Sequence, residues 1–343
     1  MQKYCPPILV GFSIMPFVDP RKCVAESARS FCVAAAVTLP IASVFLIYVA
    51  LGPMSVAWQI LCLAAVFAPV GLFYQFVRHD VRIATFCNSI ALIILGMLSG
   101  FPASCQVFYT GRGFPFVDDW LATADALLGF DWRAYLAWFD RHPGFDHIAR
   151  MAYNSIFLQP FVLAVVLAGG KKATPLYELI VAMALALLVT MLVALILPAI
   201  GTYDHLHISA ADHPHLSLMT GGKMLAPIEW LRSGAPDGTR PEMVGLISFP
   251  SYHAASAVLY ARAAWHVPWL RWLFLAVEGL MLVATPVHGS HYLVDILGGI
   301  AVAILATALT SRLFGRLSGG DVGTRWRLVG ARSGGAVGAA QNG

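Results

Sequence analysis

The chain has 343 residues, of which 59% are hydrophobic and 12% are charged, and its mean hydropathy is +0.73. Soluble domains carry about 25% charged residues, so this composition excludes an ordinary soluble domain. The formal net charge of +4 is too small to indicate a nucleic-acid-binding protein. The six cysteines show no C-x-x-C spacing, and we expect small buried hydrophobic residues rather than disulfide partners or zinc ligands.

Apolar runs of about twenty residues recur along the chain and predict membrane-spanning helices. The expected fold class is all-α, a polytopic integral membrane helical bundle of about eight transmembrane helices. The predicted spans are Phe31–Leu51, Ser55–Val77, Ile83–Phe101, Ala152–Ala168, Leu176–Ile200, Leu246–Trp265, Trp269–Pro286 and Tyr292–Phe314. Between the third and fourth spans, the tryptophans and spaced apolar residues of Trp120–Phe145 are typical of an amphipathic or re-entrant segment at the membrane interface.

The spans divide the chain into three parts. Residues 1–30 would form an N-terminal interfacial segment, and residues 31–316 a single membrane-embedded domain. Residues 317–343 are rich in Gly, Ala and Arg and have little to pack, so we expect a disordered cytoplasmic tail.

Lysines and arginines set the expected orientation in the membrane. They concentrate in the segments that are internal if the N-terminus is cytoplasmic, and the two shortest external connections contain none. By the positive-inside rule, both termini are then cytoplasmic. His253 and His291, which begin the sixth and eighth spans, would lie at the same outer surface, which we expect to face the periplasm of a bacterial inner (plasma) membrane.

The two histidines carry the chemistry of the sequence. His291 and Asp295 are spaced i, i+4, so the carboxylate can accept a hydrogen bond from one ring nitrogen and leave the other free. Such a histidine can act as a nucleophile toward phosphorus or as a general base. Ser251 and the amides that follow it could bind an anion at a helix N-terminus, and His253 in that first turn could protonate a leaving oxygen.

At these residues the sequence resembles the phosphatidic acid phosphatase type 2 superfamily. Its second motif, P-S-G-H, is similar to PSYH (Pro250–His253), and its third motif matches through His291 and Asp295. The resemblance implies that His291 is the nucleophile that becomes phosphohistidine and that Asp295 orients it. His253 would then be the general acid and Ser251 a phosphate contact, which would make residues 31–316 a catalytic domain with its core motifs in residues 195–299.

Three departures from the superfamily pattern concern the phosphate. Thr285 stands where the third motif has an arginine, and Tyr252 replaces the glycine of the second motif. No K-x6-R-P first motif is present, and the nearest residues are Arg232 and Arg240. We therefore expect Arg232 or Arg240 to bind the substrate phosphate, with a solvated loop arginine as the alternative.

The departures are similar to one branch of the superfamily, the inositol phosphorylceramide synthase type, an inositolphosphotransferase of sphingolipid metabolism. FPSYH (Phe249–His253) and ATPVHGSHYLVD (Ala284–Asp295) carry this similarity. It implies a membrane lipid phosphotransferase whose substrates are a phospholipid or other lipid phosphate and a ceramide or diacylglycerol acceptor. The alternative is a dedicated lipid phosphatase of the phosphatidic acid or polyprenyl pyrophosphate type, and no residue decides between hydrolysis and transfer.

Two further readings belong to other classes of protein. A membrane transporter would place polar residues deep in the bundle rather than at one surface. A metal-dependent membrane hydrolase could use the histidine-rich loop, which contains His205, His207, His213 and His215, although a solvated loop is the expected structure. We predict no metal and no other cofactor, because histidine and arginine can stabilise the charge of a phosphoryl group. The polar run Tyr153–Pro160 in the fourth span is expected to hydrogen-bond between helices.

Overall fold

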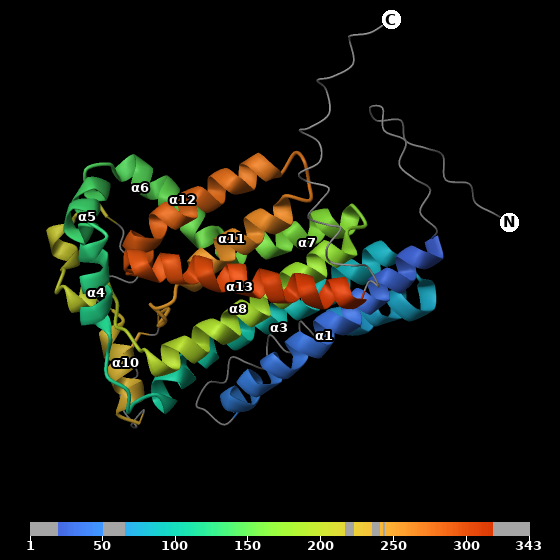
Figure 1. The fold of residues 1–343 in the computed structure, drawn as a ribbon, viewed down its shortest axis with the longest axis horizontal. Helices are drawn as coiled ribbons and strands as arrows, with labels where there is room; N and C mark the ends of the chain where they lie inside the picture. Colours follow the sequence, from blue (N-terminus) through green and yellow to red (C-terminus); the bar gives the residue numbers. More distant parts are fainter. Residues whose placement is uncertain (1–19, 51–65, 217–222, 235–240, 243, 318–343) are drawn as a thin grey trace, which may run out of the picture.

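The computed structural model describes residues 20–50, 66–216, 223–234, 241–242 and 244–317. These residues form helices and connecting loops and contain no β-strand (Figure 1). The predicted N-terminal segment is described only from residue 20, where the first helix already begins, and the predicted disordered tail lies outside the described residues.

Five described helices are long and apolar enough to cross a membrane. They are α1 (Pro20–Ala50), α3 (Val81–Thr110), α8 (Ala173–Ile196), α12 (Arg271–Gly289) and α13 (Leu293–Leu317). A sixth candidate span combines α6 (Pro143–Asn154) and α7 (Gln159–Gly169), which are bent by 60° where they meet. The all-α polytopic fold is thus confirmed, whereas the count of about eight spans is not. Of the predicted span Ser55–Val77, residues 66–77 are helical and the part before residue 66 lies outside the described residues.

The predicted sixth span begins too early. Its helix, α11, covers only Tyr252–Ala264, and the preceding residues 244–248 are not helical. Ser248 and Ser251 hold this segment against α13, because the Ser248 hydroxyl donates to the Asp295 carboxylate (2.6 Å) and the Ser251 amide to the Asp295 carbonyl (2.9 Å). These hydrogen bonds to Asp295, rather than the apolar sequence pattern, therefore determine where α11 begins.

The long helices pack around a shared apolar core. In Figure 1, α1, α3, α8 and α13 run alongside one another, and α11 lies between α8, α12 and α13. Leu163, Leu176, Tyr177 and Tyr260 are fully buried in this core. Large apolar side chains, including Trp269, Trp272, Leu297 and Ile304, face outward and are exposed, which is the surface that contact with lipid requires. The chain is therefore an integral membrane protein.

Short helices cover one end of the bundle. α4 (Asp118–Leu127), α5 (Trp132–Asp140) and α6 lie across the end where α12 finishes and α13 begins (Figure 1). α5 turns Trp132, Leu136 and Phe139 inward, so the amphipathic helical segment predicted over Trp120–Phe145 is confirmed. The remaining short elements are η1 (Tyr74–Arg78), η2 (Ser155–Phe157), α9 (Thr202–His205), η3 (Ala210–Asp212) and α10 (Leu225–Arg232).

Candidate active site

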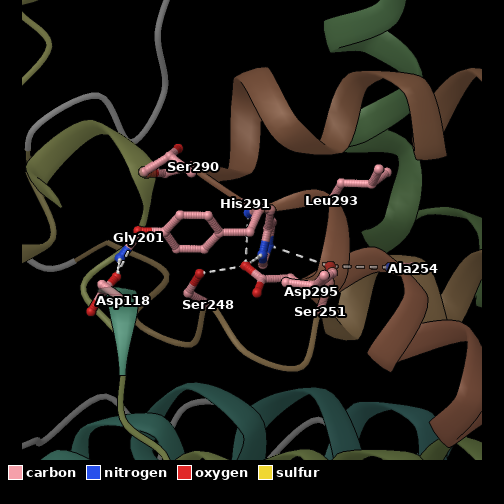
Figure 2. A network of polar contacts seen from close by, with 12 residues as sticks. Asp118, Gly201, Ser248, Ser251, Ala254, Ser290, His291, Leu293 and Asp295 are labelled. Carbon is pink, nitrogen blue, oxygen red and sulfur yellow. Dashed lines mark hydrogen bonds and ion pairs between the residues drawn. The ribbon is translucent and has the colours of Figure 1, made fainter. Parts of the chain in front are cut away.

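His291 and Asp295 form a buried pair at the turn between α12 and α13. The Nδ1 atom of His291 lies 3.1 Å from Oδ2 of Asp295, and the two residues are 3% and 0% exposed. The same oxygen accepts hydrogen bonds from the Ser248 hydroxyl (2.6 Å) and the Tyr292 amide (3.0 Å) (Figure 2). These contacts fix the ring, so that Nδ1 faces the carboxylate and Nε2 points the other way.

The free side of the His291 ring faces the start of α11. Nε2 lies 3.3 Å from the hydroxyl of Ser251, which is fully buried and caps α11 by accepting the amide of Ala254 (3.3 Å). α13 packs so closely here that a Cβ on Gly299 would lie 2.1 Å from the Ser251 carbonyl oxygen. A side chain at Gly299 would therefore push the two motifs apart.

His253 contacts Tyr153, whose hydroxyl lies close to the His291 ring. The rings of His253 and Tyr153 are stacked, with centroids 4.0 Å apart and planes 9° apart. A Cβ placed on Gly289 would lie 2.9 Å from both the Tyr153 hydroxyl and Nε2 of His291. The hydroxyl and the imidazole thus approach one point, and the structure brings His253, Ser251, His291 and Asp295 together around it.

Tyr153 and a second His–carboxylate pair were not among the predicted site residues. The polar run that contains Tyr153 was expected to bond between helices, but its ring lies between His253 and His288, with the His288 ring centroid at 6.0 Å. Nε2 of His288 lies 3.1 Å from the Asp146 carboxylate, and both residues are buried. In the sequence, Tyr153 is a tyrosine in an apolar span and His288 precedes His291 by three residues. Neither position identifies the partners of these side chains.

Two carboxylates of α4 hold the loops that carry the site. Asp125 accepts the amides of Leu293 (2.8 Å) and Val294 (2.9 Å), the first residues of α13. Asp118 accepts the amide of Gly201 (3.0 Å) and the hydroxyl of Tyr292 (3.1 Å) (Figure 2). Burial raises the pKa of both carboxyls, and the backbone hydrogen bonds oppose this rise. α4 therefore fixes the residues on either side of His291.

Replacing Asp125 by Ala is expected to destabilise the protein by about 1–3 kcal/mol, because the amides of Leu293 and Val294 lose their acceptor inside the protein. Thermal unfolding in detergent would measure this loss. Asp119→Ala is the matched control, since the Asp119 side chain lies on the same helix and is 93% exposed. Equal unfolding temperatures for the two variants would contradict a role for Asp125 in holding α13.

The predicted phosphate-binding arginines are not seen in this cluster. Nη2 of Arg232 donates to the carbonyls of Arg112 (2.9 Å) and Phe114 (2.7 Å), and its guanidinium stacks over the Phe116 ring. Arg240 lies outside the described residues. Thr285 is fully buried and donates to the Met281 carbonyl of its own helix (2.7 Å), so it offers no positive charge in place of the missing arginine.

Two histidines of the loop between α8 and α11 lie near carboxylates of α4 and α5. Nε2 of His205 lies 3.6 Å from Asp119, and Nδ1 of His213 lies 3.8 Å from Asp140. Within the described ranges, no three His, Cys, Asp or Glu side chains gather as metal ligands would. A metal site in this loop therefore has no support from the described geometry.

The fold and the site together define a polytopic helical membrane protein with a buried His–Asp pair at one end of its bundle. A family model described as the PAP2 superfamily matches residues 119–309, from α4 to α13, and the chain belongs to that superfamily. Membership indicates a lipid phosphatase or phosphotransferase type of function. No curated protein and no solved structure matches the chain.

Proposed function

We propose that the protein cleaves a lipid phosphoester through a phosphohistidine intermediate on His291. The observation that carries the proposal is the buried His291–Asp295 pair, whose free Nε2 faces Ser251 at the start of α11. A nucleophile held by an orienting carboxylate next to a helix N-terminus is the arrangement that phosphoryl transfer through histidine requires.

In the proposed first step, Nε2 of His291 attacks phosphorus and the bond from phosphorus to the leaving oxygen breaks. His253 donates a proton to that oxygen, while the Nδ1 proton of His291 remains hydrogen-bonded to Asp295. In the second step a water or an acceptor hydroxyl attacks phosphorus, His253 takes its proton, and the N–P bond breaks. The site thus returns to its starting state, as acid–base catalysis by one group demands.

The first amides of α11 supply the proposed phosphate site. Two helices, α11 and α13, begin at the cluster, and they differ in whether their first amides already have acceptors. The first amides of α13 already donate to Asp125, whereas at α11 the Ser251 hydroxyl accepts only the amide of Ala254 among the contacts of the described residues. The amides of Tyr252 and His253 precede that bond and have no acceptor within the helix. A phosphate there would meet the positive end of the helix dipole, with Ser251 as a further contact.

Arg232 and Arg240 remain proposals for additional phosphate contacts. Arg232 would have to leave the carbonyls of Arg112 and Phe114 to reach a substrate. The N-terminus of α11 can stabilise the negative charge of the phosphate without any movement of Arg232.

Headgroup transfer of the inositol phosphorylceramide synthase type is the reaction we favour over hydrolysis. The branch pattern of FPSYH and a threonine at 285 support it. In this proposal a phospholipid is the donor, and ceramide or diacylglycerol accepts the phosphoryl headgroup. The site would lie at the outer leaflet of the inner membrane, with both chain termini in the cytoplasm.

Incubating the purified protein with headgroup-labelled phospholipid, with and without ceramide or diacylglycerol, tests this proposal. The expected result is transfer of the label to ceramide or diacylglycerol when either is supplied, and no release of label when neither is supplied. Release of labelled water-soluble phosphate in both incubations would support the dedicated phosphatase instead. Absence of any cleavage across phospholipid, phosphatidic acid and polyprenyl pyrophosphate donors would overturn the enzymatic proposal.

A further inference from the structure

A cavity of about 240 Å³ lies between α1, α3, α8 and the start of α11. Its lining is mostly apolar and includes Ile41, Leu92, Gly96, Gly100 and Leu187. The family match begins at residue 119, so α8 and α11 belong to the matched region whereas α1 and α3 precede it. The cavity therefore lies between helices of the matched region, residues 119–309, and helices that precede this region.

The cavity adjoins the candidate active site. Tyr252 and His253 are both among its lining residues, and the His253 ring stacks on Tyr153 of the candidate site. Tyr252 stands where the superfamily motif has a glycine, and its hydroxyl reaches the Met183 carbonyl of α8 at 3.4 Å. This departure from the motif thus places an aromatic side chain in the cavity wall beside the site.

Most hydroxyl groups of the cavity lining already have a hydrogen-bond acceptor in the protein. Ser99, Ser104 and Thr38 donate to carbonyls of their own helices, at distances of 2.8, 2.6 and 2.7 Å. Thr190 is an exception, because its hydroxyl has no partner among the described residues. A wall in which most hydroxyl groups are already satisfied offers little to a headgroup, but it suits a hydrocarbon chain.

Two glycines on one face of α3 keep the cavity open. A Cβ on Gly96 would meet no atom within 4 Å, and a Cβ on Gly100 would meet only Leu187, at 3.8 Å. Positions 96 and 100 are four residues apart and therefore lie one above the other on the helix. A larger side chain at either position would therefore occupy space in the cavity without a steric clash.

We propose that this cavity holds one hydrocarbon chain of the substrate lipid and that Gly96 and Gly100 determine how long a chain it accepts. This inference rests on the proposed function, because it is the contact of the cavity with His253 that makes its occupant the substrate. The chain would run from the phosphate at α11 between α3 and α8 toward α1, burying apolar surface that a short chain cannot bury.

The test compares Gly96→Leu with the unchanged protein on octyl, dodecyl and hexadecyl phosphate. In the unchanged protein, kcat/KM is expected to rise with chain length. In Gly96→Leu the ratio of hexadecyl to octyl kcat/KM is expected to fall about tenfold, because the leucine occupies space that the last methylenes would fill. Gly96→Ala should give a smaller fall and serves if the leucine variant does not fold.

Gly279→Leu is the matched control. Gly279 lies on the exposed side of α12, where an added Cβ meets nothing, and it does not line the cavity. This control makes the same change to a membrane helix and should leave the chain-length ratio unaltered. Equal ratios in Gly96→Leu and the unchanged protein, or equal losses in both leucine variants, would overturn the proposal.

A binding measurement separates failure of this inference from failure of the proposed function. Octyl-, dodecyl- and hexadecylphosphonate cannot be cleaved at the P–C bond, and their effect on the unfolding temperature reports binding alone. Stabilisation that grows with chain length in the unchanged protein and not in Gly96→Leu would support the cavity even without turnover. Stabilisation independent of chain length, alongside normal turnover, would reject the cavity and leave the proposed chemistry intact.

Discussion

His291→Gln is expected to reduce turnover of lipid phosphate by about ten-thousand-fold or more, the loss that follows removal of an enzyme nucleophile. Glutamine keeps a polar side chain that can still contact Asp295 and Ser251, but it cannot form a phosphoramidate bond that later hydrolyses. Phosphate release or headgroup transfer measures the effect. Rapid acid-free quenching with labelled substrate should recover a phosphoprotein from the unchanged protein and none from the variant.

His147→Gln is the control for this substitution. His147 is exposed on α6 and contacts only Arg150 in the described structure, at 3.1 Å, so its replacement should leave turnover close to that of the unchanged protein. Substantial turnover by a folded His291→Gln protein would show that another residue attacks phosphorus and would remove the basis of the proposed mechanism.

Asp295→Asn is expected to lower turnover by about ten-thousand-fold, an effect of the size that follows when a buried carboxylate partner of a catalytic histidine is made neutral. The asparagine can still accept hydrogen bonds from Ser248 and the Tyr292 amide. It can no longer balance the positive charge that His291 acquires when Nε2 bonds to phosphorus. We therefore expect kcat to fall much more than KM rises.

Ser248→Ala separates this electrostatic effect from a loss of packing. It removes one hydrogen bond to the Asp295 carboxylate, at 2.6 Å, but leaves the charge and its contact with His291. Turnover should then fall by only about tenfold, in line with the loss of one hydrogen bond to a charged group. A loss in Ser248→Ala as large as that in Asp295→Asn would assign the carboxylate a positioning role alone.

The sequence predicts the parts of this protein that depend on local pattern. Apolar runs predict the membrane helices because lipid requires each span to satisfy its own backbone. The i, i+4 spacing of His291 and Asp295 predicts their contact on one helix face. The contact is present, although α13 begins only at Leu293 and His291 lies in the turn before it. The inferred topology also predicts that His253 lies near them, and the described structure places them around one point.

The parts that could not be predicted depend on contacts between distant segments. Asp125 appears in the sequence as one acidic residue of an amphipathic segment, and only docking of α4 on the start of α13 gives it partners. Asp118 likewise finds its partners, Gly201 and Tyr292, in segments far along the chain. Tyr153 becomes part of the site through the bend between α6 and α7. The predicted start of the sixth span at Leu246 was wrong for a similar reason, because Ser248 bonds to a residue 47 positions away instead of joining α11.

The long separation between α4 and the turn that it holds bears on how the protein is made. Asp125 precedes Leu293, whose amide it accepts, by 168 residues. Synthesis proceeds from the N-terminus and segments fold as they emerge, so α4 reaches the membrane surface well before α13 exists. Until then Asp125 is without the two amides that it accepts, whereas Asp118 already has the amide of Gly201 as a partner. The proposed site is therefore complete only after α13, which supplies Asp295, has been synthesised.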